Sequence, residues 1–508
     1  MLPLCRDEDN RVCPPLDHVV NMDSAAAPPA PPMHSTPIHT IAKQSRTASQ
    51  TTYTTLNQRN AALQSVKASL LQSREAILLA NKSDVAREEK KGTCSPQLMK
   101  RLVLNEAKFN GLITGIDQVI ALPDPTGQVS LARELDQGLN LYRVSCPIGV
   151  LCVIFEARPD AAVQIASLAI KSANSVILKG GSEAIESNRV LIQAIRAGLE
   201  QAKTVPVDAV QLVATRQDIA ELLQLDEYID LVIPRGSNAL VKHIKANTKI
   251  PVMGHADGIC AVYIDHEADP VKAVNIAVDS KINYPAACNA CETVLVHRAC
   301  LTTVLPELGR AMASKGVTMH ADDSCLPHLP TTCTVPATAE DWTREYLCLE
   351  VAIKCVETME EAIQHINRHG SGHTDCIVTE NTQSAETFMQ RIDSAGVYHN
   401  ASTRFADGFR YGFGAEVGVS TNRIHARGPV GLEGLTTYKY RMYGSGQCCH
   451  EFGGATGKKY THKDLNMELP DRTHNDVPPS EEKKEEVSVV GEGDNSAMDQ
   501  MWVPGRGC

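Results

Sequence analysis

Short apolar runs alternate with amphipathic stretches over most of the chain. The first half holds five such runs, at 148–156, 175–179, 210–214, 230–234 and 259–265. The segments between them, such as "AAVQIASLAIKSA", space apolar residues at the helical period. Short apolar strands that alternate with helices are typical of parallel βαβ units in a sheet covered on both faces. The pattern predicts an α/β domain over residues 36–275.

The same rhythm restarts after a proline- and cysteine-containing segment, "YPAACNACETV", at 284–294. Strands are predicted at 317–321, 351–356, 376–380 and 396–401. Helical spacing covers 359–368 and 383–394. We therefore expect a second α/β domain over residues 276–443, with the cysteine pair near its start.

Four parts of the chain depart from this alternation. Residues 38–120 show helical periodicity, whereas 133–146 alternate apolar and polar positions around a DQG turn, which predicts a hairpin arm. The Pro/Ala-rich segment 1–35 and the polar segment 444–508 have too few apolar residues to form a core. We expect both tails to be disordered.

Composition narrows the class of protein. A net charge of −11 argues against a nucleic-acid partner, which would require a basic face. The 17 cysteines are scattered singly, which favours reduced thiols in the cytosol over a secreted disulfide framework. No apolar run reaches the roughly 18 residues of a membrane span, and the acidic N-terminus lacks the pattern of a targeting peptide. The expected location is the cytoplasm.

Two strand-to-helix turns combine glycine with a small hydroxyl residue: "LKGGSEA" at 178–184 and "PRGSNAL" at 234–240. Such turns can bind a phosphate through the amides of a helix N-terminus, or they can simply cap the helix. No GxGxxG fingerprint follows any predicted strand, so an ordinary Rossmann dinucleotide site is not indicated.

The cysteine pair Cys288 and Cys291 has three possible interpretations: a metal site, a redox pair, or one nucleophile with an incidental neighbour. A zinc site needs two further Cys or His ligands at local spacing, and none follows. A redox CxxC is expected at the start of a helix, whereas the strand-like "ETVLVH" follows here. A nucleophile without a metal is favoured, with the other cysteine a small buried residue.

Several longer segments resemble the aldehyde dehydrogenase superfamily and, within it, the γ-glutamyl phosphate reductases (glutamate-5-semialdehyde dehydrogenases). They span residues 38 to 443 and include "GVLCVIFEARPD", "SVILKGGSEA", "DLVIPRGSNALV", "YPAACNACETVLVHR", "YHNASTRFADGFRYGFGAEVGVST" and "RIHARGPVGLEGLTTYK". The resemblance implies two α/β domains with parallel sheets, a β-hairpin oligomerisation arm and a C-terminal oligomerisation strand. It also implies a homo-oligomer without nucleic-acid or membrane partners.

The implied reaction is the NADPH-dependent reduction of L-glutamyl 5-phosphate to L-glutamate 5-semialdehyde and phosphate, in proline biosynthesis. It proceeds through a cysteine thioester, and functional coupling to a separate glutamate 5-kinase is implied as well. Matched to the family's motifs, Cys288 is the nucleophile, and the backbone amide of Asn289 stabilises the oxyanion. The family's second oxyanion donor, an asparagine, is missing, because "EARP" occupies its place.

The remaining site residues follow from the same resemblance. The cofactor-binding set is Lys179, Gly181, Ser182, Gly236, Ser237 and Glu345. The substrate-binding set is Arg158, Asn400, Arg404, His425 and Arg427. Relatives specific for NAD often carry a glutamate at the position of Ser182, where it would repel a 2′-phosphate, so NADPH is favoured.

Two alternatives remain open. The first is another semialdehyde dehydrogenase of the superfamily, which would hydrolyse its thioester. Oxidising relatives carry a water-activating glutamate in the window that reads "PVMGHADG" here, at 251–258, where only Asp257 could substitute. The second is a catalytically silent homologue that acts as a scaffold, which retention of Cys288 and Lys179 argues against.

Overall fold

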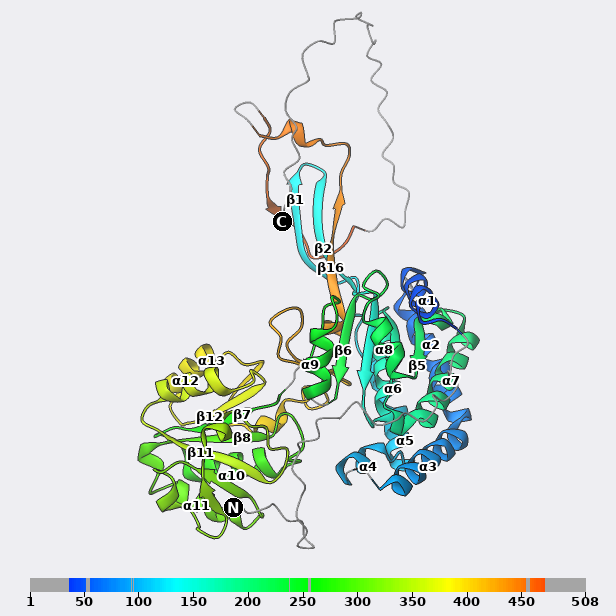
Figure 1. Ribbon diagram of the computed structural model, residues 1–508. Helices are drawn as coiled ribbons and strands as arrows, with labels where there is room; N and C mark the ends of the chain where they lie inside the picture. The colour runs from blue at the N-terminus through cyan, green and yellow to red at the C-terminus, as the bar shows by residue number, and fades with distance from the viewer. Residues whose placement is uncertain are drawn as a thin grey trace, which may run out of the picture.

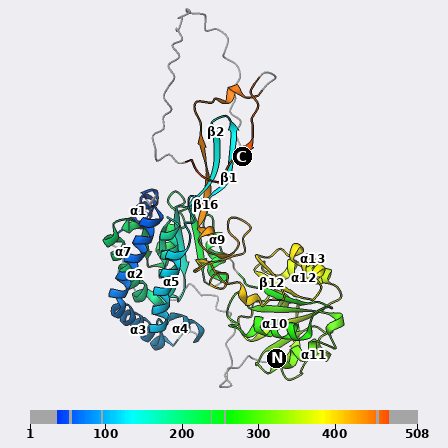
Figure 2. The ribbon, with the colours of Figure 1, turned by 180° about the vertical axis from the view of Figure 1, so that it is seen from behind.

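The computed structural model describes residues 36–51, 55–92, 94, 96–236, 238–254, 257–453 and 457–470. The predicted N-terminal tail, 1–35, lies outside the described residues. Two α/β domains stand side by side, and an antiparallel arm projects away from both (Figures 1 and 2).

The first domain is built on a four-stranded parallel sheet in the order β5-β4-β3-β6. Its strands are β3 (Val150–Phe155), β4 (Ser175–Lys179), β5 (Val210–Val213) and β6 (Leu231–Arg235). Every residue of β3 is buried, because Leu151, Val153 and Phe155 join one apolar cluster and the alternate residues join another on the opposite face. The apolar runs of the sequence therefore mark strands that are covered on both sides, as predicted.

Helices cover both faces of this sheet. One face carries α2 (Leu56–Gln72), α5 (Glu106–Ala121), α6 (Pro159–Lys171) and α7 (Ile185–Ala202). The other face carries α1 (Ile38–Thr51), α8 (Arg216–Leu222) and α9 (Asn238–Ala246). Helices α3 (Arg74–Lys91) and α4 (Pro96–Leu102) extend the helical layer. Among the described residues, no helix has both the length and the apolar character that a bilayer crossing requires.

The second domain contains a seven-stranded parallel sheet in the order β10-β9-β11-β8-β7-β12-β13. Its strands are β7 (Cys260–Ile264), β8 (Cys291–His297), β9 (Thr318–Ala321), β10 (Thr334–Pro336), β11 (Glu350–Val356), β12 (Thr374–Val378) and β13 (Gly396–His399). Helices α10 (Pro270–Ile282) and α11 (Leu305–Ala313) pack on one face, and α12 (Met359–His369) and α13 (Thr382–Arg391) pack on the other.

The structure corrects the predicted domain boundary at residue 275. Strand β7 lies before that boundary in the sequence but pairs with β8 and β12 in the second sheet. The chain also returns to the first domain late, since Val417 and Leu435, on either side of the strands β14 (Gly418–Ser420) and β15 (Gly428–Val430), join the apolar cluster of the first sheet. Hydrophobic periodicity identifies a strand but carries no information on the sheet that it joins.

The predicted hairpin at 133–146 is confirmed as the centre of the arm. Strands β1 (Val129–Asp136) and β2 (Leu139–Pro147) pair antiparallel around a turn in which Gly138 has a φ of 74°, a value that favours glycine. Strand β16 (Thr436–Tyr443) adds to β2 along its full length, so the arm joins segments that are almost three hundred residues apart.

The prediction of a disordered tail from residue 444 is wrong for 444–453 and 457–470. The C-terminal segment runs along the arm (Figure 1), where strand β17 (Lys463–Asp464) pairs with β1. Leu465 and Leu469 pack against Tyr142 and Val144 of the hairpin. A few apolar side chains suffice here because the outer edge of β1 offers unpaired backbone groups, to which a polar segment can bond. The predicted tail beyond 470 lies outside the described residues.

Candidate active site

Cys288 lies on the loop that connects α10 to β8, within the second domain. The loop is a series of tight turns, in which Ala287 N donates to Tyr284 O at 3.1 Å and Ala290 N to Ala287 O at 2.9 Å. Cys288 is half-buried, and Gly258 presses so closely against its backbone that a Cβ at position 258 would collide with it. The thiol is therefore held at a fixed place with limited access.

His373 is the residue that sequence reasoning missed. It is buried at the start of β12, and its Nε2 lies 3.2 Å from Cys288 Sγ, while its Nδ1 lies 2.9 Å from Thr374 Oγ1. A histidine at this distance can accept the thiol proton and produce the nucleophilic thiolate. The only signal in the sequence was a histidine before a buried strand, 85 residues from the cysteine, so no spacing motif connects the two.

Asn289 has a structural role that the sequence did not specify, whereas Cys291 is buried, as predicted. Asn289 is buried, with its side-chain Nδ2 donating to Ala406 O at 2.9 Å and its carbonyl accepting from Thr403 Oγ1 at 2.7 Å. Asn289 thus fixes the cysteine loop to the segment 403–406, and the oxyanion role of its N–H stays a prediction. Cys291 is fully buried, and burial raises its pKa to about 12, so it remains a protonated thiol.

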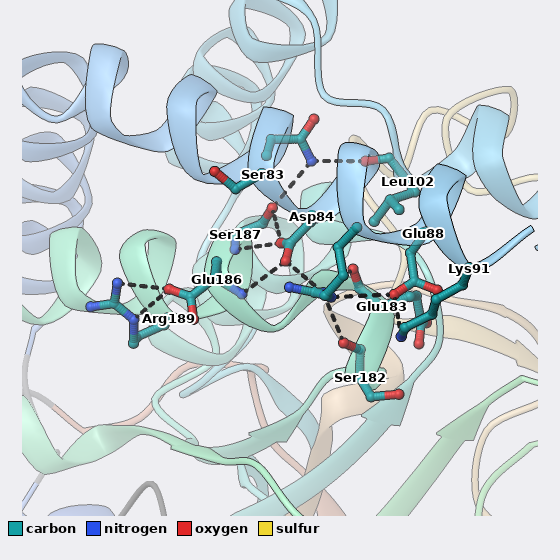
Figure 3. Close-up of polar contacts among 12 residues, drawn as sticks. Ser83, Asp84, Glu88, Lys91, Leu102, Ser182, Glu183, Glu186, Ser187 and Arg189 are labelled. Atoms are coloured by element: carbon teal, nitrogen blue, oxygen red, sulfur yellow. Dashed lines mark hydrogen bonds and ion pairs between the residues drawn. The ribbon is translucent and has the colours of Figure 1, made fainter. Parts of the chain in front are cut away.

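The turn that carries Lys179, Gly181 and Ser182 follows β4, and helix α3 supports it from behind (Figure 3). Arg87 donates to the carbonyls of Ser182 at 3.1 Å and Glu183 at 2.9 Å. Its neighbour Asp84 accepts from Ser187 N at 2.8 Å and pairs with Arg87 at 2.7 Å. Side chains from α3 therefore hold the turn in place and cap the start of α7, which the sequence gave no reason to expect.

A cleft beside this turn is lined by Gly180, Gly181, Asn188 and Val213. A Cβ at Gly180 would collide with the Asn188 side chain, so only glycine leaves the cleft open. Asn188 is buried, and its Oδ1 has no hydrogen-bond partner among the described residues. The cleft has a volume of only about 10 Å³, so this buried acceptor can meet a single donor group of a ligand and not a whole ring.

The second predicted turn follows β6. Gly236 is crowded by Glu156, and Ser237 lies outside the described residues. Glu345, predicted to bind the cofactor, accepts from Gly258 N at 2.9 Å, so it lies beside the backbone that contacts Cys288. Its other oxygen lies 3.4 Å from Asn238 Nδ2 at the start of α9. Glu345 therefore bridges the two domains next to the thiol.

The structure separates the five predicted substrate residues. Arg158 lines a cavity of about 530 Å³ between α5, α6 and the loop 407–416. Arg404 is buried and donates to Asn283 O of the cysteine loop, and burial lowers its pKa.

The other three lie elsewhere. Asn400 bonds its side chain to the backbone of Thr379 through Nδ2 at 2.9 Å and Oδ1 at 3.0 Å, and His425 is exposed. Arg427 pairs with Asp393 at 3.0 Å, beside the Gly372 backbone. A direct substrate contact stays a prediction for all five.

Comparisons with known proteins agree on one family. The sequence pattern of the aldehyde dehydrogenase family matches residues 30–326 and 330–436. The chain is 52% identical to "Gamma-glutamyl phosphate reductase 1" of Synechocystis sp. over 430 residues, which are 84% of this chain and 98% of that protein. It is 50% identical over 412 residues to the γ-glutamyl phosphate reductase of Acetivibrio thermocellus, covering 81% of this chain and 94% of that protein.

A crystal structure gives the same result for the fold. The γ-glutamyl phosphate reductase of Thermotoga maritima matches with a TM-score of 0.78 at 38% identity, over 81% of this chain and 99% of that one. An acetylating aldehyde dehydrogenase of Geobacillus thermoglucosidasius, at 16% identity and a TM-score of 0.57, is similar in fold alone.

Proposed function

The chain belongs to the aldehyde dehydrogenase family, and on that premise we propose that it reduces L-glutamyl 5-phosphate to L-glutamate 5-semialdehyde and phosphate. This reaction is the second step of proline biosynthesis from glutamate. The observation that carries the proposal is the contact of 3.2 Å between Cys288 Sγ and His373 Nε2, in a chain half identical to γ-glutamyl phosphate reductases. A buried base next to a half-buried thiol is the arrangement that nucleophilic catalysis requires.

The chain's own residues account for the acyl-transfer half of the reaction. His373 accepts the thiol proton, and the Cys288 thiolate attacks the acyl carbon of the substrate. A C–S bond forms and the C–O bond to phosphate breaks, so that the electron pair leaves with the phosphate. The backbone N–H of Asn289, the residue after Cys288, donates to the oxyanion. Such a donor typically lowers the activation free energy by about 3–4 kcal/mol. NADPH, when bound, supplies the hydride that reduces the resulting thioester.

The surroundings of Cys288 favour reduction over the hydrolytic oxidation of an aldehyde. Asp257, the one carboxylate that could replace the missing water-activating glutamate, bonds to Asn238 Nδ2 and lies 3.5 Å from Lys242 Nζ. Both contacts hold this carboxylate on α9. The paired thiol and imidazole also argue against a silent scaffold, which would have no use for them.

The finer proposal on the cofactor is that it is NADPH. Ser182 is exposed at the turn next to the cleft, and its carbonyl, not its hydroxyl, is held by Arg87. The hydroxyl is thus available to a ligand, and the guanidinium of Arg87 adds a positive charge nearby. A 2′-phosphate would meet a hydroxyl donor at this position where a glutamate would repel it.

Replacing Ser182 with glutamate should raise the Michaelis constant for NADPH roughly tenfold, because the new carboxylate would face the 2′-phosphate. The Michaelis constant for NADH should change much less. Initial rates at varied concentrations of each cofactor measure both effects. Ser83→Glu is the matched control, since Ser83 is exposed on α3 and gains the same charge away from the turn (Figure 3). If Ser182→Glu raised the Michaelis constants for NADPH and NADH equally, the turn would not contact the adenine ribose.

The overall reaction is tested most simply in reverse. The purified chain is supplied with L-glutamate 5-semialdehyde, NADP⁺ and inorganic phosphate, and NADPH is followed by absorbance. We expect the steady-state rate to rise with phosphate and to saturate. A rate that does not depend on phosphate would favour the alternative of an ordinary semialdehyde dehydrogenase.

We also propose that the chain self-associates through its arm. Strand β16 is the outer strand of the arm sheet, and Tyr438, Tyr440 and Met442 on it are each more than half exposed. A long edge strand with exposed apolar side chains is a site for pairing with another chain, most simply a second copy in a symmetric dimer.

Replacing Tyr438 and Met442 with lysine should therefore give a smaller species in light scattering at micromolar concentration. The control is the double variant Leu79→Lys/Val271→Lys, which changes two equally exposed apolar residues outside the arm. A wild-type mass for the arm variant would place the interface elsewhere.

A further inference from the structure

Arg235 is a largely buried arginine that no part of the reaction described so far uses. It is the last residue of β6, only 17% of its side chain is exposed, and it lines the same cavity as Arg158. Burying a guanidinium is costly unless anions or hydrogen-bond acceptors surround it. The cavity therefore has to supply these partners or receive them from a ligand.

The protein provides few partners that offset the cost of burying the Arg235 guanidinium. Among the described residues, its one hydrogen-bond partner is Glu416 Oε1, at a long 3.5 Å. The other oxygen of Glu416 accepts from Gly408 N at 2.9 Å, and burial raises the pKa of this carboxyl, so its negative charge is itself disfavoured. Most of the five N–H donors of Arg235 are thus left for a ligand.

Three acids line the cavity, Asp160, Asp407 and Glu416, and among the described residues only Glu416 bonds to Arg235. Asp407 accepts from Phe409 N at 3.0 Å and from Arg410 N at 3.2 Å, which satisfies it within its own turn. The guanidinium of Arg158 has no hydrogen bond or ion pair in the described part of the chain, where only its backbone carbonyl is bonded, to Ala161 N at 3.0 Å. The cavity therefore offers two arginines whose side-chain donors have few partners.

The cavity also borders the loop that carries the nucleophile. Asp407 lines the cavity and directly follows Ala406, whose carbonyl accepts from Asn289 Nδ2 at 2.9 Å, and Asn289 is the residue after Cys288. An anion bound to Arg235 would accordingly occupy a cavity next to this loop, on the side where the bond to the leaving group breaks. The α-carboxylate of the substrate cannot occupy that position, because the carbon chain separates it from the reacting carbonyl.

We propose that Arg235 binds the phosphate of the acyl phosphate and stabilises it as it leaves. This inference rests on the proposed function. As the C–O bond breaks, the electron pair passes to the phosphate oxygen, and the planar guanidinium can accept the growing charge through two parallel hydrogen bonds. In the reverse direction the same contact positions inorganic phosphate for attack on the thioester carbon.

The test compares wild type with Arg235→Gln and Arg235→Lys in the phosphate-dependent oxidation of the semialdehyde. We expect Arg235→Gln to raise the Michaelis constant for phosphate at least tenfold, with the constant for NADP⁺ changed less than twofold. Arg235→Lys should be intermediate, because it retains the charge but not the fork. The control is Arg391→Gln, which removes one exposed arginine on α13 and should behave as wild type.

A binding experiment separates this inference from the proposed function. Each variant is treated with iodoacetamide, with and without inorganic phosphate, and alkylation of the Cys288 peptide is followed by mass spectrometry. Phosphate should slow the alkylation of wild type but not of Arg235→Gln.

If wild type shows no phosphate-dependent turnover, the proposed function fails, and this protection experiment alone decides whether Arg235 binds phosphate. The inference on Arg235 is overturned if phosphate gives wild type no protection. It is also overturned if the substitutions raise the constant for NADP⁺ as much as that for phosphate, because Arg235 would then act on the neighbouring Gly236 turn.

Discussion

Replacing Cys288 with serine should lower the turnover number by roughly four orders of magnitude or more, since the proposed nucleophile is lost. A serine hydroxyl beside His373 is a far weaker nucleophile than a thiolate, because it remains protonated at neutral pH. The rate is measured by NADPH formation from the semialdehyde and phosphate.

Cys291→Ser is the matched control, because it makes the same chemical change three residues away. Cys291 is buried and its Sγ bonds to Thr293 O at 3.2 Å, so its thiol is closed to a substrate. We expect this variant to keep most of its activity. If both variants lost activity to the same extent, the assignment of a single nucleophile would be wrong.

The second large effect is expected on stability. Lys281 and Glu292 form an ion pair with Nζ–Oε2 of 2.5 Å, and both side chains are fully buried in the second domain. Removing one partner of such a pair leaves an uncompensated buried charge, which costs about 3–5 kcal/mol. Lys281→Ala should therefore destabilise the second domain by about that amount in urea unfolding followed by tryptophan fluorescence.

Two further variants separate charge from packing. Lys272→Ala removes an exposed pair with Glu380 and should cost less than about 1 kcal/mol. The double variant Lys281→Met/Glu292→Leu replaces the buried pair with apolar residues and should recover most of the lost stability. If the double variant is as unstable as Lys281→Ala, the pair stabilises the fold through its specific hydrogen bonds and not through charge balance.

The same pair connects stability to the site. Leu347 N donates to the second oxygen of Glu292 at 3.3 Å, two residues after Glu345. Weakening the pair frees the segment that places Glu345 beside Gly258. We therefore expect Lys281→Ala to raise the Michaelis constant for the cofactor as well, at temperatures where the protein is still folded.

The central strands of both sheets could be predicted because they are buried on both faces, so that each appears as an unbroken apolar run, whereas β10, a short edge strand without a buried residue, was not predicted. Strands β3 and β8 illustrate this, since every residue of β3 and all but the last of β8 are buried. The sheet that β7 joins could not be predicted, because that choice depends on pairing partners distant in sequence. For the same reason, the structure of the segment 457–470 could not be predicted, because its pairing depends on the exposed edge of β1.

The residues of the candidate site likewise form two groups: those in local sequence motifs, and those that only the fold brings together. Cys288 and the two glycine turns stand in local patterns that a sequence displays directly. His373, Arg87 and Arg235 act through contacts across the fold, with Cys288, the Ser182 turn and Glu416 respectively. An isolated histidine or arginine has no local pattern, so only the arrangement of strands and helices brings these residues to the site. His425, conversely, stands in a signature segment yet is exposed.

A single-turnover experiment tests the central claim most directly, namely that Cys288 forms a thioester that phosphate, not water, resolves. The enzyme is mixed with L-glutamate 5-semialdehyde and NADP⁺ in phosphate-free buffer, and both NADPH and the mass of the Cys288 peptide are measured. We predict that NADPH formation stops at about one equivalent per active site, that the Cys288 peptide gains one glutamyl group, and that added phosphate restores continuous turnover. Continuous turnover without phosphate, or a glutamyl group on Cys291, would contradict the account.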